Sequence, residues 1–234
     1  MLPVSRSVNS VVGRFRVIID TFLIMIYLIG GSPRVGKTNL AEALARKTSF
    51  PYFSLDHVTS VITPYIPEQE YETKLPLFAA RLRKETVDVF YAKHTTEQTV
   101  NFYLRQAETY WAGVGNFIRY AVEDEHDLIL EGWQILPHLL HTLVTPENQD
   151  KLKIVFLYKS NMENIISGLK ANTAKIDWVL RNTKEESTFS AIAKMISYFG
   201  SYIEKEAKQY NFRSVNTDVD FKQKIKDSLD SLTL

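Results

Sequence analysis

Residues 31–38 read Gly-Ser-Pro-Arg-Val-Gly-Lys-Thr and decide the fold, because they fit the pattern GxxxxGK[ST] without a mismatch. Its glycines let the backbone turn so that consecutive amide groups converge on a phosphate. Lys37 is expected to reach the β- and γ-phosphates, and the Thr38 hydroxyl to ligate Mg²⁺. The stretch therefore predicts a nucleoside triphosphate site. The residues expected to contact the nucleotide are Gly31, Ser32, Pro33, Arg34, Val35, Gly36, Lys37, Thr38 and Asn39.

The residues on both sides of this loop have the patterns that such a loop requires. Residues 24–29 form an unbroken apolar run, which is typical of a central parallel strand. From Thr38 onward, apolar residues recur at helical spacing, at Leu40, Ala43 and Leu44. Strand, loop and helix thus follow in the required order, which disfavours a glycine turn that only connects two elements.

Length and composition limit the classes of partner. With 234 residues, of which 45% are hydrophobic, the chain can bury one sizeable core. A formal net charge of +1 argues against a general nucleic-acid binder, so we expect small-molecule partners. The chain has no cysteine, which excludes a disulfide framework and suits the reducing cytoplasm.

Residues 1–23 are expected to form an extension outside the fold. Basic residues precede an apolar stretch over residues 17–29, an arrangement that resembles the start of a signal peptide. Asp20 interrupts the stretch and no small-residue cleavage site follows, so we do not interpret it as a signal. It is also shorter than the about 20 apolar residues that span a bilayer, so no membrane partner is predicted. Met25 is an alternative start of the native chain.

Asp56 is the candidate catalytic carboxylate. Residues 50–56 are interpreted as a second buried strand that ends in this acid, at the sheet edge where ligands bind in open α/β folds. There Asp56 can accept a proton from a substrate hydroxyl that attacks the γ-phosphate. The alternative is that Asp56 only caps a helix beginning at His57.

Glu131 is the second candidate carboxylate. Residues 127–132 are predicted to form a third buried strand, and Glu131 lies near its end. On a strand beside the phosphate loop, this acid would hold a Mg²⁺-bound water. The alternative is a strand-end acid that faces solvent.

About seventy residues separate these two strands, many more than a simple crossover needs. We expect residues 57–125 to form a helical substrate lobe. Tyr103, Tyr110 and Trp111 are interpreted as packing residues of one long helix rather than as a surface that stacks on bases. The apolar seam of that helix is Val100, Leu104, Ala107, Trp111, Val114, Ile118 and Ala121.

An earlier helix is predicted over residues 74–91. It carries Arg81, Arg83 and Lys84. One of these cations is a candidate ligand for an anionic acceptor, and the alternative is a solvated basic face.

The remaining elements complete an α/β fold. Residues 153–158 and 212–216 are predicted strands four and five, and a final helix ends near Leu232. The polar segment 170–185 is a candidate lid, in which Arg181 would supply a cation to the γ-phosphate. An ordinary surface arginine is the alternative. A long helix before strand five is predicted from Phe189, Ile192, Ile196, Phe199, Ile203 and Tyr210.

Read together, the stretches GGSPRVGKT, FSLD and LILEGWQILP resemble the small-molecule kinases of the P-loop class. The last is similar to the region of 2-phosphoglycerate kinases where a strand ends in Glu-Gly, and FSLDHV is similar to chloramphenicol phosphotransferase. The resemblance covers roughly residues 24–60 and 104–140. It implies a P-loop NTPase three-layer sandwich with a five-stranded parallel sheet, ATP as the phosphoryl donor and Asp56 as the general base.

Two signals for other functions are incomplete. Residues 174–177 approach the guanine-reading Asn-Lys-x-Asp pattern, but the first residue is alanine and no Asp-x-x-Gly occurs, so a signalling GTPase is not predicted. His138 and His141 share a helical face without a nearby third ligand, so a zinc site is not predicted either.

The sequence thus predicts a Mg²⁺-dependent, ATP-binding kinase domain over residues 24–234. It would transfer the γ-phosphoryl group to a hydroxyl or phosphate of a small-molecule acceptor. Two alternatives stay open: a nucleotide-dependent switch or regulatory ATPase that binds a protein partner, and a toxin-like kinase. Neither the acceptor nor the oligomeric state is indicated by the sequence.

Overall fold

A parallel sheet of five strands, in the order β4-β5-β3-β6-β7, forms the centre of the computed structural model, which describes residues 7–8, 19–20, 24–171 and 182–234. Among the described residues, a further pair, β1 and β2, forms a separate antiparallel sheet. The strands are β1 (Ser7–Val8), β2 (Ile19–Asp20), β3 (Ile26–Gly31), β4 (Tyr52–Ser54), β5 (Leu128–Glu131), β6 (Leu152–Tyr158) and β7 (Ser214–Asn216).

The register of the sheet aligns the functional ends of its strands. All six residues of β3 are buried, as expected for a strand with a neighbour on each side. Ile29 pairs with Glu131 of β5, and Gly31 pairs with Leu157 of β6. On the far side of β5, Ser54 of β4 pairs with the same Glu131. The carboxyl ends of three neighbouring strands therefore meet where the phosphate loop begins.

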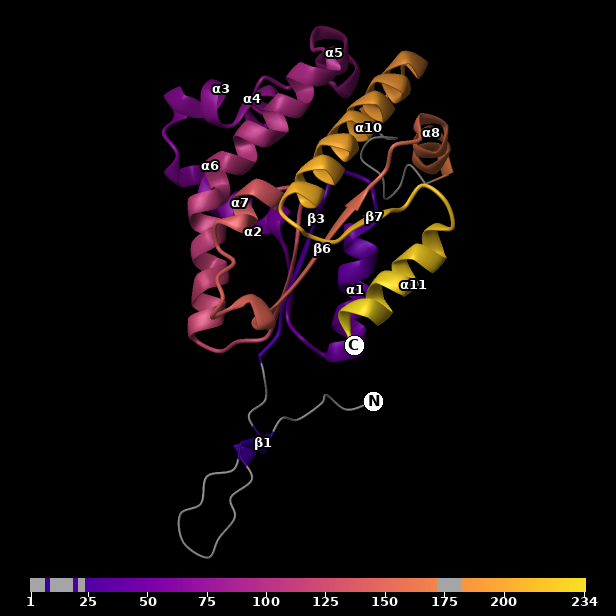
Figure 1. Cartoon of the computed structure of the whole chain (residues 1–234). Helices are drawn as coiled ribbons and strands as arrows, with labels where there is room; N and C mark the ends of the chain where they lie inside the picture. The colour runs from indigo at the N-terminus through magenta and orange to yellow at the C-terminus, as the bar shows by residue number, and fades with distance from the viewer. Residues whose placement is uncertain (1–6, 9–18, 21–23, 172–181) are drawn as a thin grey trace, which may run out of the picture.

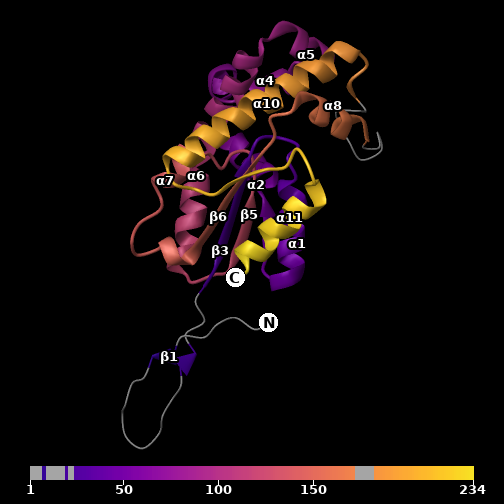
Figure 2. The same cartoon turned by 45° about the vertical axis from the view of Figure 1, so that its right-hand side comes forward.

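Helices cover both faces of this sheet, which gives three layers. Helices α1 and α11 contact each other on one face, and α10 packs with α6 and α7 on the other (Figures 1 and 2). The α/β class and the parallel sheet predicted from the sequence are confirmed. The helices are α1 (Lys37–Thr48), α2 (Leu55–Ile62), α3 (Tyr71–Lys74), α4 (Pro76–Leu82), α5 (Val87–Lys93), α6 (Thr96–Glu123), α7 (Pro137–His141), α8 (Met162–Ala171), α10 (Glu186–Gln209) and α11 (Phe221–Leu232).

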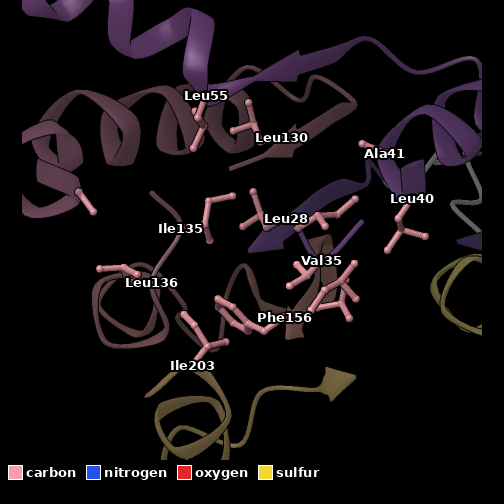
Figure 3. Close-up of a cluster of buried hydrophobic side chains, with 14 of the residues drawn as sticks. Leu28, Val35, Leu40, Ala41, Leu55, Leu130, Ile135, Leu136, Phe156 and Ile203 are labelled. Atoms are coloured by element: carbon pink, nitrogen blue, oxygen red, sulfur yellow. The ribbon is translucent and has the colours of Figure 1, made fainter. Parts of the chain in front are cut away.

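The core lies between the sheet and its helices. Figure 3 shows Leu28 of β3, Phe156 of β6 and Ile203 of α10 in one apolar cluster, and all three side chains are fully buried. Burial of each such side chain stabilises the fold by about 1.5–3 kcal/mol. These contacts hold β3, and with it the phosphate loop, in a fixed position.

Two predicted elements differ from the structure. The helix predicted over 74–91 is two helices, because Lys84 has φ 55° and Thr86 begins α5 as its N-cap by accepting a hydrogen bond from the Val89 amide. The buried strand predicted over 50–56 is the short edge strand β4, whose residues are half-buried or exposed. An edge strand has a partner on one side only, so fewer of its residues are covered.

The long helix α6 agrees with its predicted seam. Val100, Ala107 and Val114 are buried, and a capping box of Thr95 and Gln98 fixes its start. None of the described helices combines the length and apolar character needed to cross a membrane. Most of the predicted extension 1–23 and of the candidate lid, including Arg181, lies outside the described residues.

Candidate functional site

The phosphate loop joins β3 to α1 and depends on two glycines. Gly31 and Gly36 have φ 133° and 99°, values that side-chain-bearing residues rarely adopt. A Cβ atom at Gly31 would lie 2.0 Å from the Leu157 carbonyl oxygen, and one at Gly36 would lie 2.6 Å from the Phe221 ring. The loop can therefore take this shape only with glycine at both positions.

Lys37 is a buried cation within this loop. Its side chain is only 7% exposed, and its Nζ donates a hydrogen bond of 2.8 Å to the Ser32 carbonyl oxygen. Burial lowers the pKa of Lys37, and the carboxylates of Glu131 and Asp56 act in the opposite direction. An anion next to this ammonium group would interact with it strongly, because little water is present to screen the charge.

The loop also has unsatisfied donors that suit a phosphate. The Ser32 hydroxyl is fully buried and has no hydrogen-bond partner within the described part of the chain. Helix α1 begins at Lys37 without a side-chain cap, so its first-turn amide groups are free to bind an anion. These donors and Lys37 converge on the same end of α1, and they fit a bound polyphosphate.

Thr38, Glu131 and Tyr52 form a cluster of oxygen atoms beside the loop. Thr38 Oγ1 donates to Glu131 Oε1 at 3.3 Å, and Tyr52 donates to the same oxygen at 3.1 Å. Glu131 is 5% exposed, so the alternative of an acid facing solvent is wrong. Burial raises the pKa of Tyr52, and Glu131 raises it further, so the phenol stays a donor. Hard oxygen ligands of this kind suit Mg²⁺.

Asp56 lies on the first turn of α2, at the same edge of the sheet. Helix α2 begins at Leu55 with Ser54 as N-cap, so the alternative that Asp56 caps a helix starting at His57 is wrong. Trp133 Nε1 and Gln134 Nε2 each donate to Asp56 Oδ1 at 3.1 Å. In the described part of the chain nothing bonds to Oδ2, so one carboxylate oxygen is fixed and the other is available to a ligand.

One cavity of about 620 Å³ connects these groups to the helical segment between β4 and β5. Its phosphate-loop end is lined by Lys37 and Thr38, and Asp56 lines it as well. Its far end is lined by residues of α4, α5 and α6, among them Arg81 and Tyr103. Tyr103 also packs edge-on against Trp133, at a ring-centroid distance of 4.9 Å, so it has a role in the cavity wall as well as in packing.

Sequence reasoning missed four residues that support the site. Tyr52, Trp133 and Gln134 engage the two predicted carboxylates, as described above. The fourth is Thr217, which follows β7, is fully buried and donates from Oγ1 to the Val35 carbonyl oxygen at 2.9 Å. For Trp133, Gln134 and Thr217 a usable signal was position, because polar and aromatic residues immediately after predicted strands lie at the ligand-binding edge of such a sheet. Tyr52 lies within its strand and had no such signal.

Replacing Thr217 with valine is expected to loosen the phosphate loop. The change keeps the shape of the side chain but leaves the Val35 carbonyl oxygen without this donor, which costs about 1–3 kcal/mol of unfolding free energy. We also expect weaker nucleotide binding, because the loop is then less pre-organised. Urea unfolding and calorimetric titration measure the two effects.

Thr142 provides the matched control. Its hydroxyl also donates to a backbone carbonyl, that of Leu139, but Thr142 is exposed. Thr142→Val should change the unfolding free energy by no more than about 0.5 kcal/mol. If Thr217→Val were as stable as the parent protein and bound nucleotide equally well, Thr217 would not be an anchor of the loop.

Three other candidate residues, Arg83, His138 and His141, do not line this cavity. Arg83 pairs with Glu72 and Glu85. His138 contacts the hydroxyl of Tyr202 at 3.0 Å, and His141 stacks on Tyr210. These histidines therefore contribute to packing between helices. Arg181 and residues 174–177 lie outside the described residues.

A phosphate loop between a central parallel strand and a helix, within a three-layer sandwich, defines the P-loop NTPase fold. Models of known protein families and curated protein sequences gave no match to this chain. Among solved structures, a gluconokinase from Sinorhizobium meliloti 1021 is similar at 12% identity, over 90% of this chain and 92% of its own, with a TM-score of 0.48.

Two further solved structures are similar to this chain. A shikimate kinase from Bacteroides thetaiotaomicron is 16% identical over 89% of this chain and 96% of its own, with a TM-score of 0.42. A deoxyadenosine kinase from M. mycoides is 13% identical over 89% and 98%, with a TM-score of 0.43. By name these neighbours are kinases of small molecules. At these identities and TM-scores the neighbours do not assign a function to this chain.

Proposed function

We propose that this protein is a Mg²⁺-dependent phosphotransferase that moves the γ-phosphoryl group of ATP to a hydroxyl or phosphate of a small molecule. The observation that supports this function best is one continuous cavity that runs from Lys37 and Thr38 past Asp56 to α4, α5 and α6. A nucleotide switch needs a phosphate site, but it does not need a compartment for a second ligand beside that site.

The donor end of the cavity neutralises charge. The loop amides and the buried Lys37 ammonium bind the β- and γ-phosphates, where negative charge shifts during transfer. Thr38 and Glu131 would hold the metal, Glu131 by way of a bound water. When bound, Mg²⁺ neutralises charge on the phosphate oxygens. The protein's contribution is to fix these charges before the reaction begins, so that little reorganisation is needed.

The acceptor end positions the nucleophile. The acceptor oxygen attacks the γ-phosphorus, the bond to the β,γ-bridging oxygen breaks, and ADP leaves with that electron pair. If the acceptor is a hydroxyl, its proton passes to Asp56 Oδ2. Trp133 and Gln134 hold Oδ1, so the carboxylate cannot rotate away from the incoming hydroxyl.

Product analysis tests this function against a regulatory ATPase. The protein is incubated with Mg²⁺, γ-labelled ATP and pooled small-molecule metabolites, and the fate of the label is followed. A kinase gives a labelled acceptor in proportion to ADP. Label that appears only as inorganic phosphate, at a rate independent of the metabolites, would contradict the proposal.

A further inference from the structure

Arg81 is a cation of the cavity wall, and within the described residues it has no acidic partner. It lies on the last turn of α4, and its side chain lines the cavity. In the part of the chain that the structure describes, no carboxylate pairs with Arg81, whereas Arg83, two residues later, pairs with Glu72 and Glu85. The two arginines of this segment therefore differ: Arg83 forms ion pairs with two glutamates, and Arg81 forms none with the described residues.

In the described part of the chain, the carboxylates that line the same cavity make their hydrogen bonds and ion pairs with groups other than Arg81. Glu85 pairs with Arg83 and Lys93, both at 3.1 Å. Asp56 accepts two hydrogen bonds from Trp133 and Gln134, and Glu131 accepts from Thr38 and Tyr52. The positive charge of Arg81 is thus left for a group that enters the cavity from outside.

Three polar side chains of α6, those of Tyr103, Gln106 and Tyr110, line the same cavity as Arg81. Burial raises the pKa of the Tyr103 hydroxyl to about 12, and the charge of Arg81 acts in the opposite direction, as it also does at Tyr110. Both phenols line the cavity together with Arg81, and both remain protonated at neutral pH. Gln106 is 7% exposed, and its Oε1 accepts from the Leu77 amide. The amide group of Gln106 is thereby fixed in the wall.

We propose, on the basis of the phosphotransferase function above, that Arg81 is the anion subsite of the acceptor and that the acceptor is an anionic alcohol. Its hydroxyl lies at Asp56, and its carboxylate or phosphate group lies at Arg81. The planar guanidinium presents paired N–H donors that match either anion in a bidentate arrangement.

Desolvation explains why the acceptor carries a charge. Arg81 is an exposed residue of the cavity wall, so in the absence of a ligand its charge is accessible to solvent. An acceptor that fills the cavity displaces this water, and a neutral molecule would leave the cation without an equivalent partner, at a considerable cost in free energy. A carboxylate or phosphate replaces the lost water with charge-assisted hydrogen bonds, which are about twice as strong as neutral ones.

Calorimetric titration without nucleotide tests the subsite. The probes are glycerate, glycerol 3-phosphate and glycerol. All three are small alcohols; glycerate carries a carboxylate, glycerol 3-phosphate carries a phosphate, and glycerol is neutral. The variants are Arg81→Gln, the matched charge-loss control Lys84→Gln, and Lys37→Ala. Lys84 follows α4 directly and is exposed, and its side chain is not part of the cavity wall.

We expect at least one anionic probe to bind the parent protein more tightly than glycerol. Arg81→Gln should weaken that binding about tenfold or more, and Lys84→Gln should change it less than about twofold. Binding should persist in Lys37→Ala, because the anion is held at Arg81 and not at the phosphate loop. Comparison of the affinities for glycerate and glycerol 3-phosphate identifies whether the subsite prefers a carboxylate or a phosphate.

Any of three results would contradict the anion subsite at Arg81. Neither anionic probe binds the parent protein better than glycerol does, or Arg81→Gln binds the anionic probes as tightly as the parent does. The third is that only Lys37→Ala loses binding of the anionic probes. None of these measurements requires phosphoryl transfer. A protein that binds an anion at Arg81 but never phosphorylates an acceptor would contradict the proposed function and leave the subsite standing. Different observations would therefore contradict the phosphotransferase function and the anion subsite.

Discussion

Removal of the Lys37 ammonium group is expected to reduce phosphoryl transfer on the order of a hundred- to a thousandfold while the fold is retained. Lys37 is buried at the start of α1, where its charge is not screened by water and faces the expected position of the β- and γ-phosphates. In Lys37→Ala the transferring charge loses its nearest protein cation. Steady-state kinetics with ATP and the acceptor measure the loss.

Two further variants separate this effect from damage to the fold. Lys37→Met keeps the volume of the buried stem and removes the charge together with the hydrogen bond to the Ser32 carbonyl oxygen. It should lose as much activity as Lys37→Ala and melt near the parent temperature. Lys47 lies on the same helix but is exposed and pairs with Asp230 at 3.3 Å, so Lys47→Ala should keep full turnover. Near-normal turnover by Lys37→Met would refute the role given to Lys37.

Replacing Asp56 with asparagine is expected to reduce the turnover number about a hundred- to ten-thousandfold, while ATP affinity changes less than about twofold. The asparagine oxygen can still accept from Trp133 and Gln134, so the local geometry is kept. The amide nitrogen replaces Oδ2 and cannot take the proton of the acceptor hydroxyl. The measurement is kcat together with ATP affinity by calorimetry.

Asp150 offers the control for this substitution, because it is exposed and lies in the short turn before β6. Asp150→Asn should leave both kcat and ATP affinity unchanged. An unaltered kcat in Asp56→Asn would assign Asp56 to helix α2 alone, where an acid in the first turn contributes about 0.3–1 kcal/mol to stability. A parallel loss of ATP affinity would instead place Asp56 at the nucleotide.

The sequence was most informative where chemistry resides in a contiguous stretch. Residues 31–38 carry the glycines, the lysine and the hydroxyl in one turn, so their pattern predicts the loop and its flanking strand and helix without any tertiary information. The apolar runs before and after it have the length and composition of buried parallel strands. For that reason four of the five parallel strands were found close to their observed bounds, and the fifth, β4, within a longer predicted run.

Contacts between segments that are far apart in the sequence could not be predicted from local sequence patterns. Asp56 is held by residues 77 and 78 positions away, and Val35 of the loop is held by Thr217, 182 positions away. The first pairing follows from the position of β5 between β3 and β4, and the second from that of β6 between β3 and β7. Local pattern does not determine this strand order. The break at Lys84 was missed for a related reason, since no glycine or proline marks its positive φ.

Arg81, Arg83 and Lys84 illustrate the same limit. In the sequence they are one basic cluster, and the choice between an anion site and a solvated face stayed open. The structure separates them: Arg81 lines the cavity, Arg83 is paired with two glutamates, and Lys84 is exposed in the turn. At the end of a helix, side chains one or two positions apart point in different directions. Amino-acid composition alone does not predict these directions.

Calorimetric titration of the folded protein with nucleoside triphosphates and Mg²⁺ tests most directly whether residues 31–38 bind a polyphosphate. We expect a saturable heat for ATP at one site per chain, lost in Lys37→Ala and reduced when Mg²⁺ is chelated. If the parent protein gave no binding heat with any triphosphate at several temperatures, while circular dichroism showed it folded, the phosphate loop would not be a nucleotide site and the proposed function would be wrong.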